Sequence, residues 1–275
     1  MALGQVMRPK RSLGQNFLKN IGIARKMAAL ADIGPGDTVV EVGPGKGMLT
    51  RVLLDHASRV IAVEKDDHLF AYLSTTFEGR GTLHLEHRDI LDADLSALLP
   101  DGAKVVANLP YNIGTQFIIR LVDHAWRISS VVVMLQREVA ARICARTGDK
   151  DYSALSVIVS AGFDASPGFI VDPNNFFPRP RVESQVIRLV PRISTIPARE
   201  MDLFRSVVSH AFHQRRKVLR NSLIHLPRLN AEMLEALAAS ASIDLHRRPQ
   251  EISSVQYHLF SKGYGRYLEE LPPQE

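Results

Sequence analysis

The residues Asn108-Leu109-Pro110-Tyr111 place an amide, a rigid ring and an aromatic side chain within four positions. An exocyclic amine on an adenine ring is a poor nucleophile, because its lone pair is delocalised into the ring. Hydrogen bonds from that amine to the Asn108 side-chain oxygen and the Leu109 main-chain oxygen would favour the tetrahedral nitrogen that attacks a sulfonium methyl group. Pro110 stiffens the loop, and Tyr111 offers a ring on which a base can stack. The four residues therefore indicate methyl transfer to an aromatic amine, the alternative being an ordinary turn with a core tyrosine.

A glycine-rich loop, EVGPGKG, directly follows an apolar run and precedes a helix-forming segment. Glycines at such a turn let the backbone pass close to a ligand, and the helix that follows offers free N–H groups. The spacing is G-x-G-x-G, whereas a dinucleotide fingerprint would need a further glycine where Met48 stands. The loop predicts cofactor contacts at Gly43 and Gly45, with a purely structural glycine turn as the alternative.

Two acidic residues follow the next predicted strands. Glu64 lies about twenty residues beyond the glycine loop, where an acid of this architecture accepts hydrogen bonds from ribose hydroxyls. Asp89 follows the third predicted strand and is placed to bind an adenine amino group, although it would serve equally well as a helix N-cap. Both positions predict a nucleoside cofactor, but an NAD enzyme would also have an acid at position 64.

These residues need a scaffold that brings strand ends together. Short strand-like runs alternate with amphipathic stretches, and they span residues 38–42, 59–63, 82–87, 104–108 and 130–135. Continuous apolar strands separated by helices are typical of a parallel sheet covered on both faces. We therefore predict an α/β, doubly wound, mainly parallel sheet, with later strands over 163–171 and 184–190.

The chain after residue 190 has a different pattern. A proline-bounded connector, PRISTIP, precedes apolar residues at helical spacing, and Asn230 is a good N-cap for the segment that follows. We expect a basic N-terminal tail over residues 1–12 with predicted disorder, a larger domain over 13–190, and a small all-helical C-terminal domain over 191–275.

Composition narrows the class of protein. The chain has 275 residues, 45% of them hydrophobic, and a net charge of +5. Its apolar runs are all shorter than the roughly 18 residues of a membrane span, and its N-terminus lacks the apolar core of a secretory signal. The single cysteine, Cys144, excludes an internal disulfide and a cysteine-rich zinc site, and we expect it to be a packing residue. These features predict a cytoplasmic protein without a metal ion.

Basic residues predominate before Asp32 and after residue 190, whereas acidic residues predominate between them. Guanidinium groups bind phosphates in a bidentate manner, so the basic C-terminal positions are candidates for RNA binding. These candidates are Arg215, Arg216, Lys217, Arg220, Arg247 and Arg248. The alternative for roughly half of them is a surface ion pair.

The chain resembles the family of ribosomal RNA small-subunit adenine-N6 dimethyltransferases nearly from end to end. The motifs that carry the resemblance are RSLGQNFL (11–18), EVGPGKGMLT (41–50), NLPYNI (108–113), MLQREVAAR (134–142), FFPRPRVES (176–184) and RRKVLRNSL (215–223). The resemblance implies a seven-stranded methyltransferase domain, S-adenosyl-L-methionine as cofactor, and dimethylation of two adjacent adenines in a hairpin loop near the 3′ end of 16S rRNA. It implies as partner a small-subunit precursor, bound by a protein that we expect to be a monomer.

The resemblance also assigns residues whose roles no local pattern indicates. It implies that Asn16 and Leu18 close over the cofactor, in a pocket completed by Gly43, Glu64, Asp89 and Asn108. It further implies that Phe176 sandwiches the flipped adenine against Tyr111. Phe177 beside it leaves an ambiguity, because one of the two rings is expected in the core. The chain departs from the family pattern at Arg88, where glycine is frequent, and at Asp172, where proline is frequent.

Other functions remain open. A related adenine methyltransferase acting on large-subunit RNA is one alternative, which the C-terminal motifs disfavour. A protein-glutamine methyltransferase would usually have a second proline in place of Leu109. A ribosome-assembly or RNA-binding factor with secondary catalysis is an alternative of a different class, and a nicotinamide oxidoreductase is the most remote one.

Overall fold

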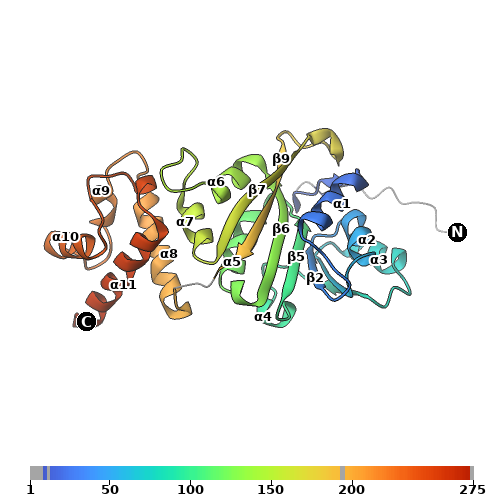
Figure 1. Cartoon of the computed structure of the whole chain (residues 1–275), viewed down its shortest axis with the longest axis horizontal. Coiled ribbons are helices and arrows are strands. Elements are labelled where there is room, and N and C mark those ends of the chain that lie inside the picture. The colour runs from blue at the N-terminus through green and yellow to red at the C-terminus, as the bar shows by residue number, and fades with distance from the viewer. Residues whose placement is uncertain (1–8, 11–12, 193–195, 273–275) are drawn as a thin grey trace. The chain divides into compact units, whose positions relative to one another are not determined.

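The computed structural model describes residues 9–10, 13–192 and 196–272. The predicted tail over residues 1–12 lies outside the described residues, apart from positions 9 and 10. The chain forms two compact units (Figure 1). The first, called the sheet unit, comprises Met1–Ala141 and Phe163–Pro191, and the second, called the helical unit, comprises Arg142–Gly162 and Arg192–Glu275.

The sheet unit is built on one seven-stranded sheet in the order β4-β3-β2-β5-β6-β9-β7. Its strands are β2 (Thr38–Val42), β3 (Arg59–Glu64), β4 (Leu83–His87), β5 (Ala103–Asn108), β6 (Ile128–Gln136), β7 (Phe163–Val171) and β9 (Ser184–Pro191). The first five pair in parallel, and β9 pairs antiparallel with β6 and with β7. The predicted α/β, mainly parallel architecture is confirmed.

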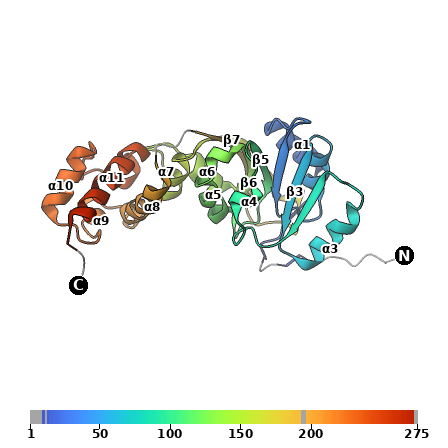
Figure 2. The same ribbon diagram turned by 90° about the horizontal axis from the view of Figure 1, so that it is seen from below.

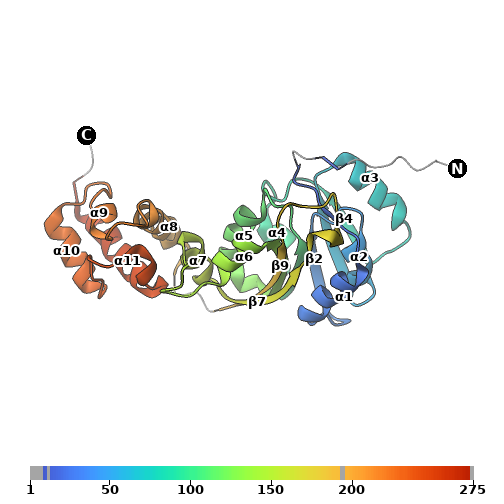
Figure 3. The ribbon, with the colours of Figure 1, turned by 90° about the horizontal axis from the view of Figure 1, so that it is seen from above.

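Helices lie on both sides of this sheet (Figure 3). They are α1 (Ile21–Leu30), α2 (Met48–Leu54), α3 (Asp67–Thr76), α4 (Leu95–Leu98), α5 (Gly114–Val122), η2 (Ala125–Arg127) and α6 (Arg137–Cys144), which ends in the helical unit. Met27 of α1 and Leu53 of α2 pack with Val106 and Val132 of the central strands in one core cluster. Consecutive valines of β5 and β6 are fully buried, because a helix-covered sheet buries both faces of its strands.

A second, two-stranded sheet joins distant parts of the chain. β1 (Phe17–Leu18) pairs antiparallel with β8 (Phe176–Phe177), which follows η3 (Pro173–Asn175). Phe17 is opposite Phe177, and Leu18 is opposite Phe176. The GQNFL and FFPRPRVES motifs therefore meet in space.

The helical unit contains α7 (Ala154–Ser160), α8 (Ala198–Phe212), α9 (Arg220–Leu223), α10 (Ala231–Ser240), η4 (Pro249–Glu251) and α11 (Ser254–Glu270). Helix α11 packs against α8 and α10 (Figure 2), and Phe204 and Phe260 are fully buried. The predicted N-cap Asn230 accepts a hydrogen bond from the Met233 N–H at 2.8 Å. The sequence placed residues 142–162 in the larger domain, whereas this segment belongs to the helical unit, because α7 packs against α8 and α11. No helix in the described ranges is long and apolar enough to cross a bilayer.

The sheet register aligns the strand ends that carry the candidate residues. Val42 is paired with Val63, and Glu64 with His87, so β2, β3 and β4 end at one edge. Strand β2 lies between β3 and β5, and the chain order reverses at this point. Ligands of open α/β sheets bind at such a switch point, beyond the carboxyl ends of the strands.

Candidate active site

A cavity opens at this edge of the sheet. Its empty volume, including solvent at the mouth, is about 1020 Å³. Every residue predicted to bind cofactor lines it, namely Asn16, Leu18, Gly43, Gly45, Glu64, Asp89 and Asn108. Leu109, Pro110 and Tyr111 line it as well. The sequence-derived site residues of the sheet unit therefore share one cavity, with the exception of Phe176.

The glycine loop contacts the N-terminal segment and also residues 108–111, which are predicted to be catalytic and are called the catalytic motif. Gly43 and Gly45 have φ angles of +64° and +59°, which side-chain-bearing residues rarely adopt. A Cβ at Gly43 would lie 3.2 Å from the Pro110 Cδ, and one at Gly45 would lie 3.0 Å from the Phe17 Cδ1. Glycine is needed here for backbone conformation and for close approach, in addition to any ligand contact.

Glu64 is a desolvated acceptor at the end of β3. Its side chain is 6% exposed, and it accepts hydrogen bonds from the N–H groups of Asp66 at 2.9 Å and Gly45 at 3.3 Å. Burial raises the pKa of Glu64, and these hydrogen bonds only partly offset that effect. Two hydroxyl donors would favour the ionised carboxylate, so this position fits the ribose of a nucleoside cofactor.

Asp89 has the capping role that the sequence left open. Its Oδ1 accepts from the Leu91 N–H at 2.9 Å, and its Oδ2 pairs with the Lys65 ammonium at 2.6 Å. Burial would raise the pKa of Asp89, but the hydrogen bonds from Lys65 and Leu91 and nearby positive charge keep it below its ordinary value. Asp89 is therefore an ionised acceptor on the cavity wall, and its contact with an adenine stays a prediction.

The Asn108 amide is oriented by the N-terminal segment. Its Nδ2 donates to the Asn16 main-chain oxygen at 3.2 Å, so the amide oxygen is the group that remains to accept from a substrate. The Leu109 N–H donates to the Met134 carbonyl at 3.2 Å, and the Leu109 side chain is 1% exposed. The catalytic loop is thus anchored to β6 on one side and to residue 16 on the other.

Tyr111 is fixed by its hydroxyl group. Its Oη lies 2.7 Å from the Oγ of Ser184, the fully buried residue that begins β9. Burial raises the pKa of Tyr111 above its ordinary value, so the phenol stays neutral. A neutral ring held at the cavity wall suits base stacking.

Phe176 and Phe177 are on opposite sides of β8. Phe176 is 2% exposed and packs in the core cluster with Leu18, whereas Phe177 is 53% exposed. Neither ring lines the cavity within the described residues. The predicted stacking role of Phe176 therefore stays a prediction, and Phe177 is the ring displayed to solvent.

The segment over residues 13–18 lies across the cavity as a strap. A Cβ at Gly14 would lie 2.8 Å from the Asn112 Oδ1, and the Lys46 ammonium lies 5.1 Å from the centre of the Phe17 ring. The strap therefore contacts the glycine loop and the loop that follows the catalytic motif. Family resemblance indicated Asn16 and Leu18, and the structure shows that the whole segment over residues 13–18 lines the cavity.

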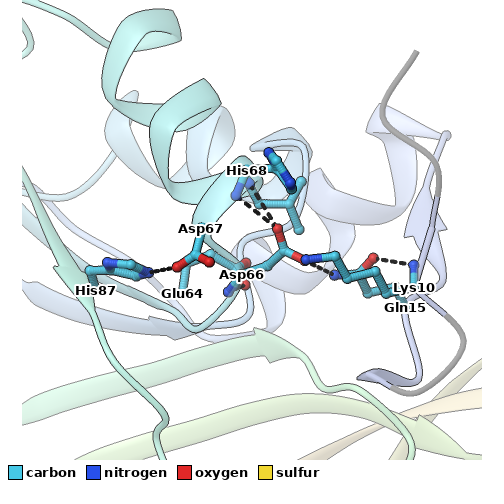
Figure 4. Close-up of polar contacts among 8 residues, drawn as sticks. Lys10, Gln15, Glu64, Asp66, Asp67, His68 and His87 are labelled. Carbon is cyan, nitrogen blue, oxygen red and sulfur yellow. Dashed lines mark hydrogen bonds and ion pairs between the residues drawn. The ribbon is translucent and has the colours of Figure 1, made fainter. Parts of the chain in front are cut away.

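Asp66 binds the strap at Gln15 and also binds Lys10, three residues before the strap begins (Figure 4). The Asp66 Oδ2 pairs with the Lys10 ammonium at 2.8 Å and accepts from the Gln15 amide at 3.3 Å. Its Oδ1 caps α3 by accepting from the N–H groups of His68 at 2.9 Å and Leu69 at 3.2 Å. The roles of Gln15 and Asp66 were not predicted from the sequence, where the available signal was the position of Asp66 just before α3 and two residues after Glu64.

The predicted RNA-binding residues, Arg215, Arg216, Lys217, Arg220, Arg247 and Arg248, all lie in the helical unit. The first three are exposed in the turn after α8. Arg220 forms an ion pair with Glu235, and Arg247 forms one with Asp244 at 3.8 Å. Two of the six therefore make the surface ion pairs that the sequence left as the alternative.

A further loop, over residues 146–150, contacts the part of the helical unit that carries these basic residues. The Gly148 N–H donates to the Gln250 carbonyl at 2.8 Å, and the Arg215 guanidinium donates to the Lys150 carbonyl. These contacts place exposed Arg146 and Lys150 beside the predicted residues, and no sequence pattern had indicated that they lie there.

Comparison with known proteins identifies the family. A family model described as "Ribosomal RNA adenine dimethylase" matches residues 6–260. The chain belongs to this family. It is 41% identical to the "Ribosomal RNA small subunit methyltransferase A" of Moorella thermoacetica, over 92% of each chain. It is 45% identical to the protein of that name from Phenylobacterium zucineum, over 78% of this chain and 75% of the relative. The resemblance predicted from the motifs is confirmed.

Solved structures agree on the fold. A dimethyladenosine transferase from Plasmodium falciparum has a TM-score of 0.75 at 23% identity, over 91% of this chain and 98% of that one. The 23S rRNA methyltransferase ErmE has a TM-score of 0.66 at 27% identity, over 90% and 99% respectively. The methyltransferase fold predicted from the sequence is confirmed.

Proposed function

We propose that this protein transfers methyl groups from S-adenosyl-L-methionine to N6 of two adjacent adenines in a hairpin loop near the 3′ end of 16S rRNA, giving N6,N6-dimethyladenosines. The observation that carries the proposal is the close approach of the cofactor loop to the catalytic motif, with Gly43 packed against Pro110 in one cavity. The names of the relatives at 41% and 45% identity support small-subunit RNA as the substrate.

The cavity residues fit a nucleoside cofactor. S-adenosylmethionine supplies a methyl group activated by a positively charged sulfur. Glu64 would accept hydrogen bonds from the ribose hydroxyls, and Asp89 would accept from the adenine amino group. The backbone at Gly43 and Gly45, together with Asn16 and Leu18 of the strap, would enclose the rest of the cofactor.

The acceptor amine is prepared by oxygen atoms rather than by a strong base. The Asn108 Oδ1 and the Leu109 carbonyl would accept hydrogen bonds from the N6 hydrogens and draw the lone pair out of conjugation. The nitrogen bonded to the new methyl group becomes acidic and releases its proton to water. Tyr111 would support one face of the target base, with Phe176 as the proposed partner on the other face.

RNA binding is proposed for the basic surface of the helical unit. Its guanidinium and ammonium groups would contact phosphates, and the target adenines would be presented unpaired in a loop. We extend the proposal to a precursor of the small ribosomal subunit as the substrate particle. The protein would act on it in the cytoplasm, as a monomer and without a metal ion.

The proposal is tested by mass spectrometry of RNA after incubation of the protein with labelled cofactor and either isolated small-subunit particles or large-subunit RNA. We expect two neighbouring N6,N6-dimethyladenosines in the small-subunit RNA alone. Labelling of large-subunit RNA instead would favour an activity like that named for ErmE. If an Asn108→Ala variant lost methylation and yet supported particle maturation fully, an assembly role would be primary.

A further inference from the structure

Arg120 of α5 binds three main-chain carbonyl groups of one turn. Its Nη1 donates to the oxygens of Ile90 at 2.6 Å and Leu91 at 2.5 Å, and its Nη2 donates to the oxygen of Ala93 at 2.6 Å. A planar guanidinium can satisfy several acceptors in a fixed geometry, whereas an ammonium group acts as a compact point charge. Arg120 thus cross-links the main-chain carbonyl groups of the turn that follows Asp89.

This turn forms part of the cavity wall. The Asp92 N–H donates to the Asp89 carbonyl at 3.1 Å, and the carboxylate of Asp89 caps the same turn through Leu91. Asp89 and Ile90 both line the cavity, and Ile90 is 3% exposed. A buried main-chain carbonyl group without a hydrogen-bond donor costs free energy. Arg120 supplies donors to three carbonyl groups in the turn that carries Asp89 and Ile90.

Within the sheet, this turn and the catalytic loop are not neighbours. The turn follows β4, an edge strand, and β3 and β2 separate β4 from β5, which ends at Asn108. Helix α5, in contrast, begins directly after the catalytic loop. The Pro110 carbonyl accepts from the N–H groups of Ile113 and Gly114, both at 3.2 Å. A Cβ at Gly114 would lie 2.6 Å from the Leu135 side chain, so α5 starts against β6.

We propose that Arg120 is a positioning residue, which fixes the Asp89 turn relative to the Asn108 loop and so sets the affinity and base selectivity for the nucleoside end of the cofactor. This inference rests on the proposed function. Asp89 would hold the adenine amino group, Asn108 would hold the methyl acceptor, and Arg120 would keep the two at a working separation without touching either ligand.

The test uses Arg120→Met, which removes the donors, and Arg120→Lys, which keeps the charge. Arg127→Met is the matched control, because Arg127 also donates to a main-chain carbonyl, that of Leu99 at 3.1 Å, but not to the Asp89 turn. Calorimetry would measure binding of S-adenosylhomocysteine and of its analogue with oxygen in place of the 6-amino group. Steady-state kinetics would give kcat and the KM for S-adenosylmethionine.

We expect Arg120→Met to weaken S-adenosylhomocysteine binding and raise the cofactor KM by about tenfold or more. Its preference for the amino over the 6-oxo base should fall, whereas kcat at saturating cofactor should change much less than KM. Arg120→Lys should change the cofactor affinity, the KM and the base preference in the same direction but by less. Arg127→Met should match the unaltered protein in all three. If Arg120→Met fails to fold, Arg120→Lys decides by the same criteria.

The inference is overturned if a folded Arg120 variant retains both the affinity and the base preference of the unaltered protein, or if kcat falls as much as the cofactor affinity. Failure of the proposed function has a different signature. In that case the unaltered protein itself would neither bind S-adenosylhomocysteine nor methylate RNA.

Discussion

Replacement of Glu41 by Gln should stabilise the cofactor-free protein at alkaline pH. Glu41 lies in β2, lines the cavity and is 1% exposed, and its Oε2 has no hydrogen-bond partner in the described part of the chain. Burial raises the pKa of Glu41 from 4.5 to about 8, with a smaller contribution from the charge of Glu64, and nearby Thr50 offsets only part of this. The folded protein therefore carries a proton that the unfolded chain releases.

The size of the effect follows from linkage. Between pH 4.5 and 8 the folded state binds more protons at this group than the unfolded state, so the free energy of unfolding decreases as the pH rises. At about 1.4 kcal/mol per pH unit, the full interval corresponds to about 5 kcal/mol. From pH 5 to pH 8 we expect a loss of about 3 to 4 kcal/mol, because the unfolded chain is already mostly ionised at pH 5 and the folded carboxyl is half ionised at pH 8. Glutamine cannot ionise and should escape this loss.

Urea unfolding followed by circular dichroism at several pH values would measure the difference. The unaltered protein and Glu41→Gln should have similar stability near pH 5, and the variant should be more stable by about 3 to 4 kcal/mol near pH 8. Glu78→Gln, which removes an exposed carboxylate from the same unit, serves as the control and should follow the unaltered protein. Parallel profiles for the unaltered protein and Glu41→Gln from pH 5 to 8 would refute the reasoning.

Three further predictions concern ligand binding. Gln15→Leu should remove the hydrogen bond between the strap and Asp66 and weaken cofactor binding by about threefold to tenfold in calorimetry, with little change in melting temperature. Unchanged affinity would show that cofactor binding does not depend on this hydrogen bond. Phe176→Ala should lower the melting temperature because the ring is buried, whereas Phe177→Ala should leave stability nearly intact. If Phe177→Ala alone lowers kcat, then Phe177 rather than Phe176 stacks on the target base. Replacing both Arg216 and Lys217 by Gln should lower RNA affinity and flatten its dependence on salt concentration, and an equal slope would remove them from the interface.

The fold was largely predictable because its signals are local. Most strands of the large sheet correspond to short apolar runs, and the runs ending at Val42 and Asn108 were located to within a residue. The glycine turn and the N-cap at Asn230 were predictable for the same reason, because glycine and N-cap preferences depend on only a few neighbouring residues. By contrast, β1 and β8 are two residues long each, and their pairing is a tertiary contact that no periodicity indicates.

The site was predictable where one strand end supplies one functional side chain, as for Glu64 and Asn108. It was not predictable where a polar group acts through a distant main-chain atom, as Arg120 does on the Asp89 turn and Gln15 does by way of Asp66. The ambiguity between Phe176 and Phe177 has the same origin. Neighbouring residues of a strand point to opposite sides, and only the pairing with β1 decides which of them is buried.

Single-turnover methylation of small-subunit particles by an Asn108→Ala variant tests whether the Asn108 amide oxygen prepares the acceptor amine. We predict that the rate of methyl transfer falls by at least about 100-fold, because the amine loses a hydrogen-bond acceptor that favours its tetrahedral form, while RNA binding persists and cofactor affinity falls far less. Transfer at a rate close to that of the unaltered protein, with cofactor and RNA bound normally, would contradict it.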